Sequence, residues 1–218
     1  MAVVEIKFCG MTRPEDASYA ALLGARYVGV IFADGPRTLT RERAQVIVDG
    51  LPRRVSRVGV FGRQSPNEIA EIAARLELDV AQLHGDPTSE TIADVRARWN
   101  GRVWAVQRIS GSALPSSTRE LFDVADAIVL DARVAGQLGG TGVTLPWEDL
   151  AQALAPLRSR RARLVVAGGL KPDNVVHAIA ALSPDVVDVS SGIEQSPGVK
   201  DHDRMRAFRD AVEQISPS

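Results

Sequence analysis

The single cysteine of the chain, Cys9, follows a short apolar segment and directly precedes a glycine. Side chains alternate along a β-strand, so Lys7 and Cys9 would share one face while the apolar residues between them face the other way. A neighbouring ammonium lowers a thiol pKa from about 8.5 and favours the reactive thiolate. The pair therefore predicts a chemically active cysteine. The sequence leaves open that Cys9 is only a small buried apolar side chain.

Two aspartates occupy comparable positions. Asp131 closes the apolar run 127–131, and Asp188 lies near the end of the run 186–190. A carboxyl group can act as an acid near neutral pH if burial raises its pKa, and we expect partial burial to do so for Asp131. The alternative, equally open, is that Asp131 caps the loop that follows it.

Glycines and serines follow the last two apolar runs: Gly168 and Gly169 after one, and Ser190, Ser191 and Gly192 after the other. Glycine lets backbone N–H groups approach a phosphate closely, and serine hydroxyls add donors. Because both glycine-bearing ends occur on consecutive runs, they predict a phosphate-binding site.

Three further features could complete a pocket. Arg37 could bind a carboxylate through two parallel hydrogen bonds, although alone it reads as a solvated loop arginine. His84 ends the run 80–84 and is expected to form a pocket wall. The glycine-rich stretch 132–147 is longer than most connections, which predicts a functional loop.

These residues are positioned by a regular alternation of apolar runs and amphipathic stretches. The alternation predicts a single α/β domain over residues 1–218, a closed (βα)8 TIM barrel whose active site lies at the carboxyl ends of the strands. An open doubly wound sheet is the alternative, but it usually has a glycine-rich turn after its first strand. The predicted strands are 4–9, 27–32, 57–61, 80–84, 103–107, 127–131, 164–168 and 186–190.

Several helix starts can be read from proline and capping residues. Residues 12–15 and 65–68 each predict a capping box with proline at the first helical position. Pro87 and Pro172 predict two further starts, and residues 201–215 predict a closing amphipathic helix.

Composition excludes several classes of protein. The chain has 218 residues, 26 basic and 27 acidic, so nothing indicates binding to nucleic acid or to an anionic membrane. No apolar segment approaches the ~18 residues of a membrane span, and no signal peptide is evident, so we expect a cytoplasmic protein. His84, His177 and His202 are scattered, so no metal site is expected.

Taken in order, these motifs resemble those of phosphoribosylanthranilate isomerases, the (βα)8 enzymes of tryptophan biosynthesis. The resemblance covers nearly the whole chain, with Gly35 where the family usually has serine and Thr38 where it often has tyrosine. The shared motifs are residues 7–12, 35–37, 82–85, 130–131, 139–142, 167–170, 188–192 and 197–201.

The resemblance implies an Amadori rearrangement of N-(5-phosphoribosyl)anthranilate to 1-(2-carboxyphenylamino)-1-deoxyribulose 5-phosphate, without a metal or organic cofactor. It implies that Asp131 protonates the ring oxygen and that Cys9 removes the C2 proton. The only partner implied is this small-molecule substrate, bound by a monomer or a homodimer. The implied contacts are Arg37 with the anthranilate carboxylate, Asp188 with the sugar or amine, His84 as a wall, Gly168, Gly169, Ser190, Ser191 and Gly192 with the phosphate, and Gly140 and Thr141 closing over the site.

Two other functions remain as alternatives. A sugar-phosphate isomerase of the histidine-biosynthesis type would need aspartates on the first and fifth strands, but the first ends in Cys9 and the fifth carries no acid. A non-catalytic sugar-phosphate-binding barrel would have lost the acid or the base, whereas Cys9 and Asp131 are both present.

Overall fold

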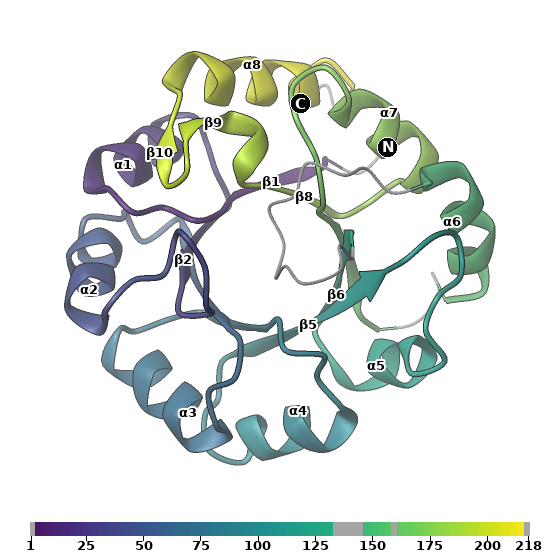
Figure 1. Ribbon diagram of the computed structural model, residues 1–218, viewed down its shortest axis with the longest axis horizontal. Helices are drawn as coiled ribbons and strands as arrows, with labels where there is room; N and C mark the ends of the chain where they lie inside the picture. The colour runs from purple at the N-terminus through teal and green to yellow at the C-terminus, as the bar shows by residue number, and fades with distance from the viewer. Residues whose placement is uncertain (1–2, 133–145, 158–160, 216–218) are drawn as a thin grey trace.

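Eight parallel strands close into a barrel in the order in which they occur along the chain, with β8 paired back to β1. The computed structural model describes residues 3–132, 146–157 and 161–215. Helices surround the barrel (Figure 1), which confirms the predicted (βα)8 fold. The strands are β1 (Glu5–Phe8), β2 (Tyr27–Ile31), β3 (Ser56–Phe61), β4 (Val80–Leu83), β5 (Arg102–Ile109), β6 (Ala127–Ala132), β7 (Arg163–Val166) and β8 (Val186–Val189).

The helices that follow the strands form the outer ring. The predicted closing helix is confirmed as α8, where the carboxylate of Asp201 accepts from the first-turn amides of Asp203 and Arg204. The helices are α1 (Pro14–Leu22), α2 (Arg41–Asp49), α3 (Pro66–Arg75), α4 (Ser89–Arg96), α5 (Thr118–Val124), α6 (Trp147–Leu154), α7 (Val175–Leu182) and α8 (His202–Glu213), with short 3-10 helices η1 (Ala155–Leu157) and η2 (Ser191–Ile193).

The capping box at residues 65–68 is confirmed: the side chain of Ser65 accepts from the Glu68 amide, and the Glu68 carboxylate accepts from the Ser65 amide. The box at residues 12–15 is wrong. Arg13 is the N-cap residue and makes no side-chain cap, because the Thr12 hydroxyl donates to the carbonyl of Gly198, 2.5 Å away. The Thr12 hydroxyl, which the local sequence predicted to cap α1, therefore binds the distant hairpin residue Gly198.

Two of the predicted helix starts are displaced. Helix α4 begins after Pro87, at Ser89, because the hydroxyl of Thr88 accepts from the Thr91 amide and caps the helix there. Helix α7 begins at Val175, three residues after Pro172. In both places the proline precedes the helix and does not form its first residue.

Strand alternation divides the core into two layers. Ten buried residues fill the interior of the barrel, and a larger apolar cluster packs the outer face of the sheet against the helices. Parallel strands covered on both faces in this way are expected to be rich in Val, Ile and Leu. The interior residues are Tyr27, Val58, Val80, Trp104, Val106, Ala127, Val129, Val165, Ala167 and Val186.

A small antiparallel hairpin, which the sequence did not predict, lies between β8 and α8 (Figure 1). Its strands are β9 (Glu194–Ser196) and β10 (Val199–Lys200), and Gly198 in the turn has a φ of 83°. Strands of three and two residues are too short to show a periodic pattern. The hairpin matters because its side chains reach the site described below.

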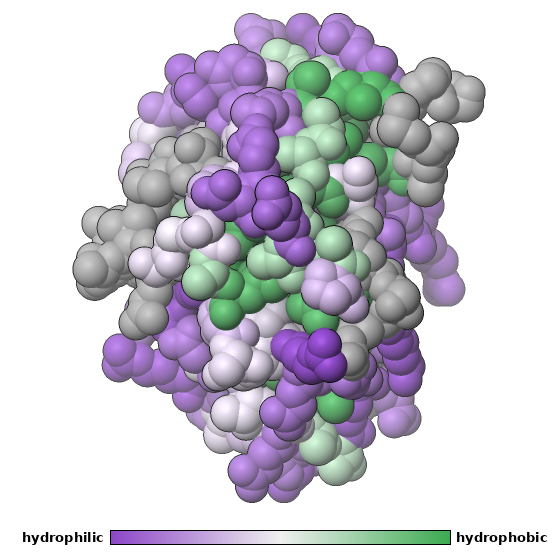
Figure 2. Space-filling model, turned by 90° about the vertical axis from the view of Figure 1, so that its right-hand side faces the viewer, coloured by the Kyte–Doolittle hydropathy of each residue, from purple (hydrophilic) through white to green (hydrophobic). Residues whose placement is uncertain are grey.

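The outer surface is mostly hydrophilic. Figure 2 shows the side of the molecule that carries α6, where hydrophilic residues surround smaller hydrophobic areas. Among the described residues, the large hydrophobic side chains that are exposed are Val3, Leu22, Val46 and Val176, which come from different elements. No helix in the described ranges is both long enough and apolar enough to cross a membrane.

Candidate active site

Most of the predicted site residues meet in one cavity of about 1260 Å³ at the carboxyl ends of the strands. This is the end at which barrels of this type carry out their chemistry. Gly192 is not among the lining residues, and Gly140 and Thr141 lie outside the described residues. The expected residues that line the cavity are Cys9, Arg37, His84, Asp131, Gly168, Gly169, Asp188, Ser190 and Ser191.

Cys9 lies on the inner face of the barrel, as strand alternation predicted. The residue two positions earlier, Lys7, is fully buried, and its ammonium donates to Asp188 Oδ2 at 2.6 Å. A side chain on Gly29 of β2 would place its Cβ 2.8 Å from the sulfur of Cys9. The glycine therefore provides the room that the thiol occupies.

The charge state of Cys9 differs from the sequence-based expectation. Burial is the largest influence and raises the pKa of the thiol above its ordinary value of 9.0. The Lys7 ammonium lowers the pKa and the Asp188 carboxylate raises it again. The expectation that Lys7 would give Cys9 a lowered pKa is wrong in net direction, because burial outweighs a cation that is already paired with Asp188.

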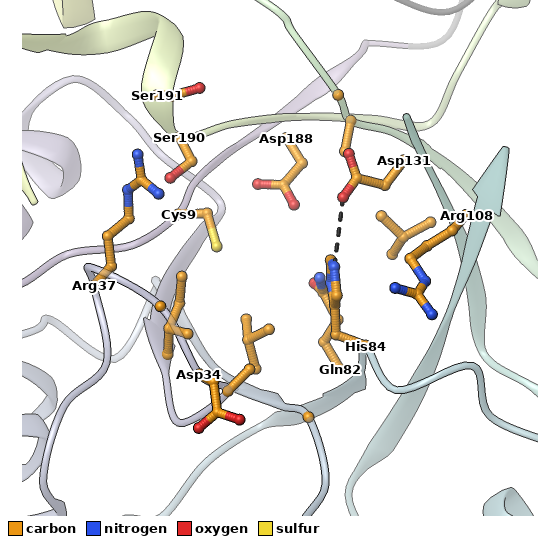
Figure 3. A pocket seen from close by; sticks show the side chains of 18 of the residues that line it. Cys9, Asp34, Arg37, Gln82, His84, Arg108, Asp131, Asp188, Ser190 and Ser191 are labelled. Atoms are coloured by element: carbon orange, nitrogen blue, oxygen red, sulfur yellow. Dashed lines mark ion pairs between the residues drawn. The ribbon is translucent and has the colours of Figure 1, made fainter. Parts of the chain in front are cut away.

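Asp131 is placed across the cavity from Cys9, with Asp188 between them (Figure 3). Burial raises the pKa of Asp131 to about 6, and the nearby Asp188 carboxylate acts in the same direction. The Ala132 amide and the cations of Lys7 and Arg108 oppose the shift without cancelling it. The raised pKa expected for this aspartate is confirmed, and it makes Asp131 a proton donor near neutral pH.

His84 lies beside Asp131, with 3.5 Å between Nε2 and Asp131 Oδ2 (dashed line in Figure 3). Burial, with the cations of Arg108 and Lys7 acting in the same direction, lowers the pKa of His84 to about 4. The imidazole is therefore neutral at pH 7, so its contact with Asp131 is not a pair of opposite charges.

Several buried polar atoms around the cavity have no hydrogen-bond partner among the described residues. They are both ring nitrogens of His84, Asp188 Oδ1 and Gln82 Oε1. Buried polar groups in proteins are almost always satisfied, so unpaired ones that line a cavity indicate groups reserved for a ligand. The carboxylate and amide oxygens would accept from hydroxyl or amine groups, and the imidazole could donate or accept.

Arg37 is neither solvated nor free. Its Nε and Nη2 donate to the two carboxylate oxygens of Glu194, at 2.7 and 2.6 Å. Glu194 Oε1 also accepts from the ammonium of the buried Lys200 at 2.8 Å. Arg37 lines the cavity, whereas the other two are not among its lining residues. A cationic group therefore reaches the ligand space with a buried ion network behind it.

The glycine and serine segments after β7 and β8 form another part of the cavity wall. Gly168 and Gly169 have φ of 80° and 67°, which side-chain-bearing residues rarely adopt. Gly192 packs so tightly that an added Cβ would lie 1.9 Å from the carbonyl oxygen of Leu170. The Lys200 ammonium also donates to the Ser190 carbonyl, at 3.1 Å, which adds positive charge next to this wall.

Sequence reasoning missed several polar residues of this region. Gln82 and Arg108 line the cavity from β4 and β5, and Arg108 is paired with Asp86. Glu194 and Lys200 lie on the unpredicted hairpin. Strand alternation could have placed Gln82 and Arg108 on the inner face of the barrel. Nothing in the sequence connects Glu194 with Arg37, which is 157 residues away. In the described part of the chain, no cluster of three or more His, Cys, Asp or Glu residues could hold a metal ion.

Comparisons with known proteins agree with this arrangement. The sequence model of a family described as N-(5'-phosphoribosyl)anthranilate (PRA) isomerase matches residues 6–211. The chain is 38% identical to N-(5'-phosphoribosyl)anthranilate isomerase of Pseudomonas fluorescens over 213 residues, covering 97% of this chain and 100% of the relative. A crystal structure of the phosphoribosyl anthranilate isomerase of Thermotoga maritima superposes with a TM-score of 0.84 at 34% identity, covering 97% and 99% of the two chains.

A second solved structure is informative because it contains a ligand. It is a phosphoribosyl anthranilate isomerase in complex with reduced 1-(o-carboxyphenylamino)-1-deoxyribulose 5-phosphate. This chain is similar to it with a TM-score of 0.80 at 32% identity, covering 97% of this chain and 99% of that one.

Proposed function

This chain belongs to the N-(5'-phosphoribosyl)anthranilate isomerase family, and we propose that in it Asp131 is the general acid and Cys9 the general base of the reaction. The reaction is the Amadori rearrangement of N-(5'-phosphoribosyl)anthranilate to 1-(2-carboxyphenylamino)-1-deoxyribulose 5-phosphate, a step of tryptophan biosynthesis. No atom is gained or lost, so the protein has only to bind the substrate and move protons.

The reaction begins at the ring oxygen of the ribose. Asp131 donates its proton to that oxygen while the bond to C1 breaks, which leaves a protonated Schiff base between C1 and the anthranilate nitrogen. Cys9 then removes the proton from C2, and the electron pair flows to the nitrogen and forms an enolamine. Proton transfer to C1 and loss of the C2 hydroxyl proton give the ketone product.

The observation that carries this assignment is the pair of proton-transfer groups facing one cavity. Asp131 has a pKa of about 6 and lies opposite Cys9, which is adjacent to the buried ammonium of Lys7. An acid and a base on opposite sides of the substrate suit a reaction that adds a proton at one atom and removes one from another. The fifth strand offers no carboxylate for the histidine-biosynthesis alternative.

The rest of the cavity fits the other ends of the substrate. Arg37 would bind the anthranilate carboxylate, and the glycine and serine segments around Gly168 and Ser190 would bind the phosphate. Asp188 Oδ1 has no partner and would accept from a sugar hydroxyl or the amine. His84 would form a wall beside Asp131.

The remaining expectations are proposed on the same basis. The barrel strands and helices run from Glu5 to Glu213, which supports one catalytic domain over residues 1–218. Gly140 and Thr141, which the family resemblance adds to the substrate-binding residues, lie outside the described residues. A biosynthetic role supports action in the cytoplasm. Both a monomer and a homodimer agree with a site built from this chain alone, and one of the similar solved structures is of mutually generated monomers of the dimeric isomerase from Thermotoga maritima.

Turnover of the substrate tests the function. The purified protein should remove the fluorescence of N-(5'-phosphoribosyl)anthranilate with time, and the gene should restore growth to a tryptophan auxotroph that lacks this isomerase. Binding of the reduced product analogue without any turnover would instead support the non-catalytic barrel.

A further inference from the structure

The buried ion network behind Arg37 contains a charge that the proposed mechanism does not use. Glu194 is 8% exposed and Lys200 is 2% exposed, so both charges are largely removed from water. Burying a carboxylate is costly unless cations and hydrogen bonds compensate for the lost water. Here Glu194 receives two bonds from Arg37 and one from Lys200. Because burying these charges adds little or nothing to the stability of the fold, the network is expected to serve the binding site.

The geometry of the guanidinium indicates how the network serves the site. A guanidinium has two edges that can each bind a carboxylate through two parallel bonds. Glu194 occupies the edge formed by Nε and Nη2 of Arg37. No hydrogen bond joins Nη1 to another described residue, so the second edge, Nη1 with Nη2, is left for a carboxylate that enters the cavity.

We propose that Glu194 is a positioning residue: it holds one edge of Arg37 so that the other edge meets the carboxylate of the substrate, while Lys200 offsets the charge of Glu194. The inference rests on the proposed function, because the substrate supplies that second carboxylate. With two cations and one anion, the network keeps one net positive charge. Without Lys200, the carboxylate of Glu194 would cancel the attraction that Arg37 exerts on the ligand.

The position of Glu194 is itself fixed by the hairpin. The side chain of Arg204 on α8 donates to the Glu194 carbonyl at 2.5 Å. The amide of Lys200 donates to Asp16 Oδ2 on α1 at 3.1 Å. Gly10 has a φ of 70°, and a Cβ there would lie 2.6 Å from Cδ of Arg37, so the arginine stem is closely confined as well. The Arg37–Glu194 ion pair thus joins the hairpin, which is held by α1 and α8, to an arginine whose side chain is confined by Gly10.

A pair of ligands that differ only in the carboxylate tests the proposal. The two ligands are the reduced product analogue and the same compound with hydrogen in place of its carboxyl group. In the wild type the carboxylated ligand should bind more tightly. Glu194→Gln should reduce that preference about tenfold, as expected for losing the alignment of a charge-assisted pair, and leave the affinity for the second ligand unchanged. In turnover, KM should rise about tenfold while kcat changes less than about threefold.

The matched control is Glu71→Gln. Glu71 pairs with Arg41 at 2.6 Å but lies on the outer surface, away from the cavity. This variant should bind both ligands as the wild type does. In an Arg37→Ala background, Glu194→Gln should have no further effect on the preference, because Glu194 acts through Arg37.

Three results would overturn the proposal. Glu194→Gln could weaken both ligands equally, which is the signature of a structural role, or it could strengthen the carboxylated ligand, which would make Glu194 a competitor for Arg37. A wild type that binds both ligands equally would also contradict it.

If Glu194→Gln does not fold, the double variant with Lys200→Met removes both buried charges and should show the same loss of preference. Binding is measured without turnover, so a protein that fails to turn over substrate overturns the proposed function separately.

Discussion

At the scale of single residues, the proposed acid and the proposed base have pKa values in an unfavourable order. The pKa of Asp131 is about 6, whereas that of Cys9 lies above 9.0. The productive form needs Asp131 protonated and Cys9 ionised. Between the two pKa values that form is only a small share of the free protein, and this share does not change with pH.

This order predicts the pH profile of kcat/KM. Below about pH 6, Asp131 is already protonated and further acid only removes the thiolate, so kcat/KM should fall about tenfold per pH unit. From about pH 6 up to the raised pKa of Cys9 it should be flat. Initial rates at low substrate concentration, corrected for substrate stability, measure the profile. A decrease of kcat/KM that begins between pH 7 and 8, whether the pH is raised or lowered, would contradict the pKa of Asp131 or the raised pKa of Cys9.

The raised pKa of Asp131 also predicts a stability effect. The native state holds this proton more tightly than the unfolded chain, whose aspartate has a pKa near 3.8, so stability falls as the pH rises from 3.8 to about 6. Asp131→Asn removes that loss. At pH 8 it should increase the free energy of unfolding by up to about 3 kcal/mol, and at pH 3.5 by almost nothing.

Urea unfolding at the two pH values measures this difference. Asp173→Asn is the control: it removes an exposed ion pair with Lys171 and no buried carboxyl group, so it should not increase the free energy of unfolding at pH 8. Equal stability of Asp131→Asn and the wild type at pH 8 would show that burying the ionised carboxylate of Asp131 does not destabilise the fold.

At the scale of elements, tight glycine contacts fix the wall predicted to hold the phosphate. A methyl group on Gly192 would lie 1.9 Å from a backbone oxygen of Leu170, and backbone cannot move aside as a side chain can. The segment after β8 must therefore shift when this glycine is replaced.

Gly192→Ala should weaken binding of inorganic phosphate by at least about tenfold, because a shift near 1 Å misplaces every donor of the segment. Gly50→Ala is the control: the atom nearest to the added Cβ would be 3.7 Å away, and Gly50, the C-cap residue of α2, is not among the residues that line the cavity. Calorimetric titration with phosphate gives both affinities. Unchanged affinity in Gly192→Ala would remove this segment from the phosphate site.

The elements also show where sequence reasoning succeeds. All eight barrel strands could be predicted, because strands buried on both faces form apolar runs between helices. Strand alternation then placed Cys9 and Lys7 on one face of their strand, which in the structure is the inner face of the barrel. The hairpin β9–β10 could not be predicted, since its five strand residues show no period, and its ion pair joins Glu194 to a residue 157 positions away.

At the scale of the whole molecule, the barrel brings together groups that no local pattern connects. Cys9 directly follows β1, Asp131 lies on β6, the segments proposed to bind the phosphate follow β7 and β8, and Arg37 lies in the segment after β2. Sequence alone predicted these members, but the net pKa of Cys9 depends on burial within the closed barrel and was predicted in the wrong direction. Burial is a property of the assembled fold, so it could not be read from a strand.

The central claim is that this isomerase uses Asp131 and Cys9 as its acid and base. Its most direct test is the rate of fluorescence loss from N-(5'-phosphoribosyl)anthranilate with the wild type, Cys9→Ala and Asp131→Asn, each also titrated with the reduced product analogue. We expect each substitution to lower kcat by at least about a hundredfold, the usual contribution of one proton-transfer group, while the analogue still binds. A kcat within threefold of the wild type in either variant would contradict the account.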